Sequence, residues 1–591
     1  MASGIPTWDL TALYPSLDCP ALSAALDAAE ERFRQLEREA GGISPQDANA
    51  VFRLLQEFDE AALAFSDPST YLSLRSMTEP MSTDLSRRAT RAASIKARQD
   101  KLWASLLQLL ASVPDVEALL DSDAGLSHYA FPIREHRRLA VHRPPLEQRE
   151  ILQSMQRNGG QGWLALRNAL DASAAAPLRP GEPPLPLAQL RGLAASPDSE
   201  IRRLAYEAEL KLYPSYEIPM AACLSAIKGE ALEELPYKGY ASVKTEMEDI
   251  NKISGETLRS MFRSIEDHIP HFQQYLRRKA ALLGHSGGLP WYDLLAPMEG
   301  IPAGFSFEAA RDMLSSALHS FSPEIGALAD RALSSRWIDA LPAEGKQGGA
   351  ISVDLPARRE NRILTNYSGS FRCIRTIAHE LGHAYHARCL DRVPLLLRDP
   401  PTPICETASL MNEVVFLNKT LDTLPDEQRF ALLESDLQES TQTVLDIYSR
   451  YLFEEEVFTR RMDHALLPGE LCQMMEDAQR RVFGSALDNR FLHPYMWMCK
   501  VHYYIPEFHY YNYPYIFGLL LAKGLYARYR EKPAGFPEAY RRLLSSTCSG
   551  SMEDITAQAG VNIRDRAFWD SALDLIVEEI GQWIRLADQR T

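Results

Sequence analysis

The sequence predicts a mostly α-helical protein with one small β-sheet. Apolar residues recur at three- and four-residue spacing with charged residues between them, the pattern of helices that bury one face. The clearest stretches are 21–40, 85–110, 201–212 and 427–462. Alternating strand patterns are scarce, and the one credible strand region is 348–367, in which glycine and proline breaks precede 362–367. A composition of 46% apolar and 24% charged residues is that of a globular protein.

The helical pattern breaks most clearly in the proline-rich stretch 176–186. Proline cannot continue a helix because it lacks the backbone N–H and clashes with the preceding turn. Asp198 and Ser199 then offer side chains that cap the start of a new helix. We therefore predict a domain boundary here, with an N-terminal helical lobe over residues 1–196 and a larger domain over residues 197–591.

Charge and composition exclude several classes of function. The net charge is −16, which disfavours a nucleic-acid-binding role because such a role needs a basic surface. No window approaches the roughly 18 uninterrupted apolar residues of a membrane span, and the N-terminus lacks the pattern of a secretory signal. The eight cysteines lie far apart without a CxxC pair, which is typical of reduced thiols. We expect a cytoplasmic protein without nucleic-acid or membrane partners.

The segment 376–386 contains the motif HExxH, which carries most of the functional prediction. His379 and His383 are four residues apart, so on a helix both imidazoles project from one face about one turn apart. This spacing delivers two nitrogens to one Zn²⁺ at about 2.0–2.1 Å. Glu380 follows the first histidine and is placed to reach a water molecule on the metal instead of the metal itself.

A catalytic zinc takes three protein ligands, so a third ligand must come from elsewhere. The pattern HExxHxxGxxH is excluded because His386 and Cys389 stand where it requires glycine and histidine. Glu406, which follows a proline-rich loop, is our predicted third ligand. Glu413 lies seven residues further, on the same helical face, and is a candidate partner for the N–H of a ligand histidine. We expect His386 to serve packing or hydrogen bonding.

These residues resemble the oligoendopeptidase F branch of the thimet-oligopeptidase-like zinc metallopeptidases. The resemblance extends over nearly the whole chain, and its motifs are 8–16, 291–297, 366–370, 379–386, 406–409, 412–413 and 568–573. It implies a large helical ellipsoid with a deep central channel and a small sheet beside the HExxH helix. It also implies that residues 197–591 form the zinc metallopeptidase domain, which cuts short peptides, and that residues 1–196 form a lobe that restricts access to the channel.

A second dense segment, 502–515, contains six tyrosines and two histidines. Ordinary core packing favours Leu, Ile and Phe, because every buried tyrosine hydroxyl needs a partner. The cluster therefore indicates a polar wall of hydrogen-bond donors, although an aromatic plug of the interior has the same composition. In the family that the chain resembles, C-terminal His and Tyr residues donate to the scissile carbonyl. Our best alignment assigns these roles to His502, Tyr511 and Tyr515, with His509 as a competitor of His502.

Together these residues predict a zinc-dependent endopeptidase with one Zn²⁺ per chain and oligopeptide substrates. The metal activates a water molecule, Glu380 acts as general base, and the strand 362–366 pairs with the substrate main chain. A helical zinc carboxypeptidase, which shares HExxH and a downstream glutamate, is the neighbouring alternative. A catalytically inactive peptide-binding helical scaffold is the alternative from another class. The sequence leaves the cleavage preference and the oligomeric state open.

Overall fold

The structure is a computed structural model that describes residues 4–44, 47–79, 82–122, 124–298 and 300–590. The chain forms two compact units, each assembled from three segments. The first unit comprises Met1–Ala140, Pro302–Thr423 and Arg528–Val561; the second comprises Val141–Ile301, Leu424–Ala527 and Asn562–Thr591. The division at residue 196 stays a prediction. It cuts the chain once, whereas the segments of the two compact units alternate along the chain.

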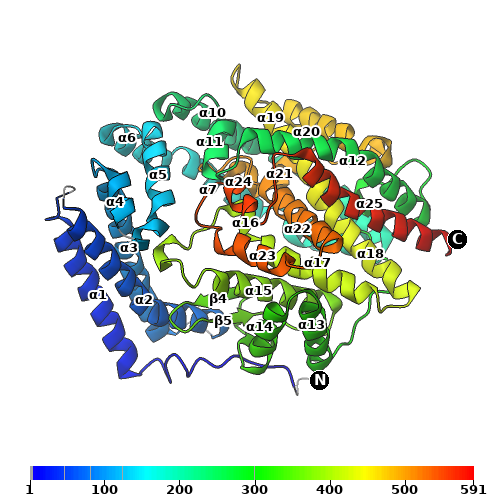
Figure 1. The fold of residues 1–591 in the computed structure, drawn as a ribbon. Coiled ribbons are helices and arrows are strands. Elements are labelled where there is room, and N and C mark those ends of the chain that lie inside the picture. Colours follow the sequence, from blue (N-terminus) through cyan, green and yellow to red (C-terminus); the bar gives the residue numbers. More distant parts are fainter. Residues whose placement is uncertain (1–3, 45–46, 80–81, 123, 299, 591) are drawn as a thin grey trace. The chain divides into compact units, whose positions relative to one another are not determined.

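The first unit consists mostly of helices (Figure 1). They are α1 (Pro20–Ala40), α2 (Ala48–Thr78), α3 (Thr83–Ala111), α4 (Val116–Ser122), α5 (Ala130–Arg138), α13 (Phe307–Phe321), α14 (Pro323–Ser334), α15 (Phe371–Cys389), α16 (Thr402–Cys405), α17 (Thr407–Leu421), α23 (Phe536–Ser545) and α24 (Met552–Ala557).

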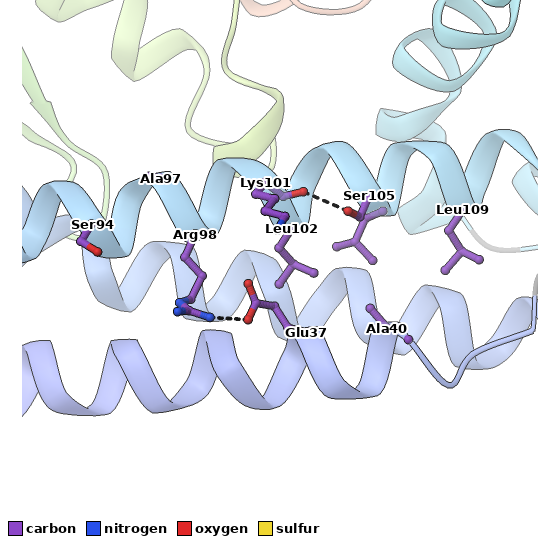
Figure 2. Close-up of a pocket in the computed structure, with 11 residues that line it drawn as sticks. Glu37, Ala40, Ser94, Ala97, Arg98, Lys101, Leu102, Ser105 and Leu109 are labelled. Carbon is purple, nitrogen blue, oxygen red and sulfur yellow. Dashed lines mark hydrogen bonds and ion pairs between the residues drawn. The ribbon is translucent and has the colours of Figure 1, made fainter. Parts of the chain in front are cut away.

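The N-terminal helices α1, α2 and α3 pack together through their apolar faces. In α1, the spacing of Leu22, Leu26, Phe33 and Leu36 puts all four on one buried face. Between α1 and α3 lies a groove of about 630 Å³ (Figure 2), across which Arg98 pairs with Glu37.

The sheet of the first unit has three strands in the order β3 (Ile338–Asp339), β5 (Glu360–Leu364), β4 (Ile351–Leu355). Strand β5 runs parallel to β3 and antiparallel to β4, with Ile351 opposite Leu364. Both edges of β5 are therefore occupied, and the outer strand on this side is β4. The sequence predicts that 362–366 pairs with substrate main chain. This prediction is wrong, because Ile363 and Leu364 already pair with β3 on one side and with β4 on the other.

The second unit is also helical. Its helices are α6 (Leu146–Gln156), α7 (Gly160–Ser173), α8 (Leu187–Gly192), α9 (Ser199–Leu212), α10 (Glu217–Lys238), α11 (Val243–Ile250), α12 (Gly255–Leu282), α18 (Asp426–Thr441), α19 (Ile447–Arg461), α20 (Pro468–Phe483), α21 (Met496–Cys499) and α25 (Arg566–Asp588). Helix α22 (Tyr513–Glu531) begins in this unit. A buried cluster around Tyr213, Trp497, Tyr503 and Tyr504 forms its core.

The predicted helical class is confirmed, and the stretches singled out by periodicity are helices. The proline-rich stretch 176–186 is a two-strand hairpin, β1 (Ala175–Ala176) and β2 (Leu185–Pro186), within the second unit. Asp198 caps α9 by accepting from the backbone N–H of Glu200 at 2.8 Å. The stretch 427–462 is two helices joined by a π-helical turn at Gln442–Asp446. No described helix is long and apolar enough to cross a membrane.

Candidate functional site

The HExxH motif lies in the middle of α15, as predicted. Ser370 caps this helix, and its Oγ accepts from the backbone N–H of Cys373 at 3.3 Å. His379 and His383 project from the same face, with ring centroids 4.8 Å apart. Local sequence alone therefore sets this pair, because the cap fixes where the helix begins and the four-residue spacing does the rest.

Glu406 joins this pair because α17 packs closely against α15. Glu406 is the residue directly before α17, between α16 and α17. A Cβ atom on Gly382 would lie 2.5 Å from Ser409 Cα, so the helices reach this separation only with glycine at that position. Asn412 Nδ2 donates to the Ala378 carbonyl at 3.2 Å and links the two helices.

The three predicted ligands form a triangle of nearly equal sides. His379 Nε2 and His383 Nε2 are 3.1 Å apart, and Glu406 Oε2 lies 3.2 Å and 3.4 Å from them. For a tetrahedral ion with ligand bonds of about 2.0–2.1 Å, the ligand atoms are about 3.3 Å from one another. The residues present therefore fit a Zn²⁺-sized ion bound by two imidazoles and a carboxylate.

Glu413 fixes the protonation state of one imidazole. His379 Nδ1 lies 2.6 Å from Glu413 Oε1, and Arg375 pairs with the other carboxylate oxygen. Because Nδ1–H donates to the carboxylate, the Nε2 lone pair of His379 points to the centre of the triangle. This is the arrangement predicted from the seven-residue spacing of Glu406 and Glu413.

Hydrogen bonds and charges within the cluster shift the pKa values of His379 and Glu406 in opposite directions. Burial alone would lower the pKa of His379, but hydrogen bonds to Glu406 and Glu413 outweigh burial and raise this pKa to about 10. Burial likewise would raise the pKa of Glu406, but the two imidazoles hold it well below its usual range. The negative charge of Glu406 thus attracts cations, and a metal ion competes with protons for the same nitrogen atoms.

Glu380 lies between the triangle and the sheet: its carboxyl interacts electrostatically with His379, His383 and Glu406. Its side chain is buried, and burial raises the pKa of its carboxyl. The backbone of Ser352 in β4 forms a hydrogen bond with it. The predicted general base thus lies next to the outer strand of the sheet.

His386 takes a structural place. It is buried on α15, and its Nε2 is 2.8 Å from Thr547 Oγ1. Burial lowers its pKa to about 4, which keeps the ring neutral near pH 7. This matches the expected packing and hydrogen-bonding role.

The segment 502–515 belongs to the second unit. The rings of His502 and Tyr511 are stacked at 4.7 Å, and Tyr511 and Tyr515 are 6.0 Å apart. Tyr515 is 42% exposed, whereas Tyr503 and Tyr504 are fully buried. Burial, with Arg450 and Lys500 nearby, lowers the pKa of His502 to about 4. Their contact with a substrate carbonyl stays a prediction.

His509, the competitor of His502, is 2% exposed and already engaged. Its Nδ1 lies 3.1 Å from Lys228 Nζ, and Lys228 donates to Glu454 at 2.5 Å. His509 therefore has a buried partner, Lys228, within the second unit.

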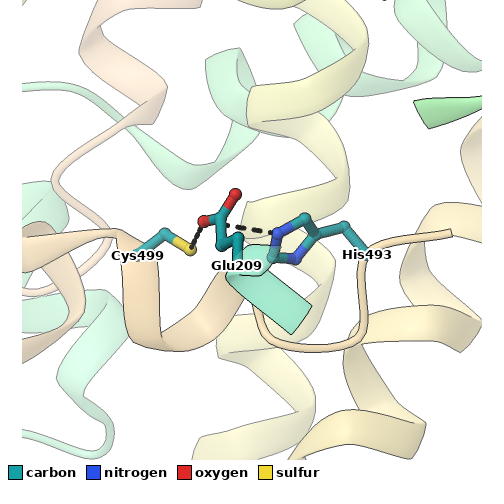
Figure 3. Close-up of side chains that lie close together, drawn as sticks. All are labelled: Glu209, His493 and Cys499. Carbon is teal, nitrogen blue, oxygen red and sulfur yellow. Dashed lines mark hydrogen bonds and ion pairs between the residues drawn. The ribbon is translucent and has the colours of Figure 1, made fainter. Parts of the chain in front are cut away.

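A second group of potential metal ligands lies in the second unit and was not predicted (Figure 3). Glu209 Oε1 is 3.5 Å from His493 Nε2 and 3.5 Å from Cys499 Sγ. The same oxygen accepts from the Tyr213 hydroxyl and is 3.3 Å from Arg191 Nε. The carboxylate charge is thus balanced by a guanidinium within the protein.

Sequence reasoning missed three residues that shape the first cluster: Arg375, Gly382 and Ser409. Arg375 is four residues before His379 on the same helical face. This spacing could have indicated that Arg375 lies near the metal-ligand cluster. Ser409, three residues after Glu406, donates to Glu406 Oε2 at 2.9 Å. Gly382 lies inside the motif, but its role depends on a helix that the motif does not contain.

The sequence is similar to a peptidase family and to two bacterial oligopeptidases. Residues 304–575 match the profile of Peptidase family M3. The chain is 24% identical over 395 residues to the group B oligopeptidase PepB of Streptococcus agalactiae, covering 66% of this chain and 64% of that protein. It is 25% identical over 393 residues to the oligopeptidase PepF of Bacillus subtilis, covering 66% and 58%. The matched region is thus less than two thirds of these relatives' length.

Solved structures with the same fold cover nearly the whole chain. A Chlamydophila abortus protein superposes with a TM-score of 0.84 at 19% identity, covering 97% of this chain and 98% of that one. The oligoendopeptidase F of Enterococcus faecium gives a TM-score of 0.65 at 18% identity, covering 96% and 98%. These likenesses establish the fold. The matches to the Peptidase family M3 profile and to the oligopeptidases confirm the resemblance drawn from the sequence motifs.

Proposed function

We propose that this chain, whose residues 304–575 match the profile of Peptidase family M3, is a zinc-dependent endopeptidase that hydrolyses short peptides. The observation that carries the proposal is the triangle of His379, His383 and Glu406, whose sides of 3.1–3.4 Å suit a tetrahedral ion. We assign one Zn²⁺ per chain to these three residues. The eight free thiols support a reducing compartment such as the cytoplasm.

The chemistry divides between the ion and the protein. When bound, Zn²⁺ supplies Lewis acidity that makes water a nucleophile near neutral pH and polarises the substrate carbonyl. Glu380 accepts a proton from the attacking water. It then donates this proton to the amine nitrogen as the amide C–N bond breaks. General acid–base catalysis of this kind typically contributes about 10²–10⁴ in rate.

We assign binding of the substrate main chain to the outer strand β4 of the first unit. An extended peptide that pairs with the β4 edge gains main-chain hydrogen bonds and so tolerates many side chains. Ser352 of this strand contacts Glu380, which supports a substrate position beside the general base.

We propose that His502, Tyr511 and Tyr515 donate hydrogen bonds to the scissile carbonyl oxygen as it becomes negative. The partial exposure of these three residues supports the assignment, since His509 and most other tyrosines of the segment are buried. The contact of His509 with Lys228 favours His502 as the donor.

The test is mass spectrometry of the fragments released from a peptide ladder, with and without a chelator. We expect internal cleavage that stops with the chelator and returns with Zn²⁺. Glu380→Gln should keep one equivalent of metal and lose at least about 10²-fold in kcat. The matched control is Glu427→Gln, a change of an exposed carboxylate that should leave kcat unchanged.

Three outcomes would contradict parts of this proposal. Cleavage that persists without metal contradicts metal dependence, and unchanged cleavage by Glu380→Gln contradicts its role as base. Removal of single C-terminal residues, abolished by C-terminal amidation, would identify a carboxypeptidase instead.

A further inference from the structure

A cavity of about 1080 Å³ lies within the first unit, apart from the metal ligands. It is lined by the C-terminal end of α15 and the residues that follow it, by the start of α14, and by α23 with the loop after it. Neither His379, His383 nor Glu406 lines it. The cavity is therefore a separate feature, and the proposed peptidase function leaves it unexplained.

Arginine dominates the charge of this cavity. Its lining contains Arg359, Arg388, Arg392, Arg541 and Arg542 against three carboxylates, Glu324, Asp391 and Glu538. The chain as a whole has a net charge of −16, so this local excess of positive charge runs against the overall composition. A concave site with one sign of charge concentrates ligands of the opposite sign.

Three of these arginines have no partner. Arg388 pairs with Asp391 at 3.1 Å, and Arg541 lies 3.5 Å from Glu324. Within the described part of the chain, the guanidinium groups of Arg359, Arg392 and Arg542 form no ion pair or hydrogen bond; nor does the Glu538 carboxylate form an ion pair. The buried Nε of Arg388 also makes no hydrogen bond. Exposed arginines without a protein partner thus outnumber carboxylates without one around the cavity.

The backbone holds one of these arginines in an unusual conformation. Arg359, in the turn between β4 and β5, has a φ of 52°, in the left-handed region that favours glycine. Such strain persists only where the surrounding structure imposes it, and here the paired strands fix the turn. Arg359 is therefore held at the cavity by the sheet.

We propose that this cavity binds a small anion that carries a polyphosphate group. Guanidinium groups match phosphate oxygens with paired N–H donors, and several of them together suit more than one phosphate. Ser545, Ser546 and Ser549 add hydroxyl groups to the lining, while Pro323, Val393 and Pro537 add apolar surface. The volume exceeds that needed for inorganic phosphate alone and accommodates an organic group such as a nucleoside.

Isothermal titration calorimetry on the metal-loaded full chain tests the proposal. Adenosine triphosphate, tripolyphosphate and adenosine are titrated in turn. We expect saturable binding of adenosine triphosphate, and no binding of adenosine. Tripolyphosphate that binds as tightly as adenosine triphosphate assigns the ligand as free polyphosphate, and weaker binding assigns it as a nucleotide. Binding of adenosine as tight as that of the triphosphate would overturn the proposal.

Variants locate the binding site. Arg392→Gln combined with Arg542→Gln changes two exposed, unpaired side chains and should weaken binding at least tenfold. Arg87→Gln, an exposed arginine outside the cavity, is the matched control and should bind as the parent chain does. The proposal is wrong if neither phosphate compound binds saturably, or if the double variant binds as the parent does, which would place the anion at the metal centre or elsewhere.

Discussion

In the described part of the chain, two groups of three potential ligand side chains lie within metal-binding reach of one another, and the two clusters differ in what surrounds the carboxylate. In the first unit, Glu406 contacts His379, His383 and Ser409, and no described lysine or arginine pairs with it. In the second unit, Glu209 already has Arg191 and Tyr213 as partners.

The clusters also differ in access. The side chains of His379, His383 and Glu406 are 24–40% exposed, so ions, water and substrate reach them. Those of Glu209 and His493 are 10% and 2% exposed. Burial raises the pKa of the Cys499 thiol to about 12, so this ligand atom is protonated at neutral pH. The two clusters therefore share donor types but differ in the charge compensation of the carboxylate and in exposure.

The largest expected difference between the clusters is in metal content. His379→Ala should reduce bound zinc from one equivalent to none and abolish peptide cleavage, because two remaining ligands do not hold the ion. His493→Ala, its counterpart in the second cluster, should leave one equivalent bound. Inductively coupled plasma mass spectrometry of both variants checks this. Loss of zinc from His493→Ala, or a full equivalent in His379→Ala, would reverse our assignment of the two clusters.

The second cluster should instead show its importance in stability. Glu209→Gln leaves the Arg191 guanidinium without its carboxylate and should reduce the free energy of unfolding by about 3 kcal/mol. Urea unfolding at pH 7 measures this change. Glu207→Gln on the same helix removes a partly exposed pair with Arg203 and should cost less than about 1 kcal/mol. Equal effects of the two substitutions would show that the pair of Glu209 with Arg191 stabilises the fold no more than the more exposed pair of Glu207 with Arg203 does.

The same carboxylate should make stability depend on pH. Burial would raise the pKa of Glu209, but His493, Arg191 and Tyr213 lower it to about 2, from its ordinary value of 4.5. The unfolded chain therefore binds the proton more tightly. The stabilisation, about 3 kcal/mol, is complete above about pH 4.5 and is lost as the pH falls through 2. Unfolding measured over this range should be less steep in Glu209→Gln, and an unchanged slope would contradict the assignment.

A smaller effect is expected on the zinc affinity of the first cluster when Glu413 is changed. Glu413→Gln removes the negative partner of the His379 N–H, so zinc affinity should fall about 10–100-fold. Competition with a fluorescent chelator measures this affinity. Glu427→Gln serves again as control. An unchanged affinity would mean that Glu413 stabilises the helix pair without tuning the metal.

By itself, the sequence determined what depends on short spacings. The periodicity of α1, the Ser370 and Asp198 caps, and the face shared by His379 and His383 all follow from residues within a few turns of one another. Even the link of Glu413 to His379 was predictable, because seven residues bring a second carboxylate back to the same helical face.

Only the tertiary structure decided which long-range neighbours these residues have. Glu209 and His493 are 284 positions apart, and nothing in either segment shows that they meet or that Arg191 compensates the carboxylate. Strand β5 is the central strand of the sheet and β4 is an edge strand, because β5 pairs with both β3 and β4. Side-chain spacing is a property of the local backbone, whereas charge compensation and burial depend on packing between distant segments.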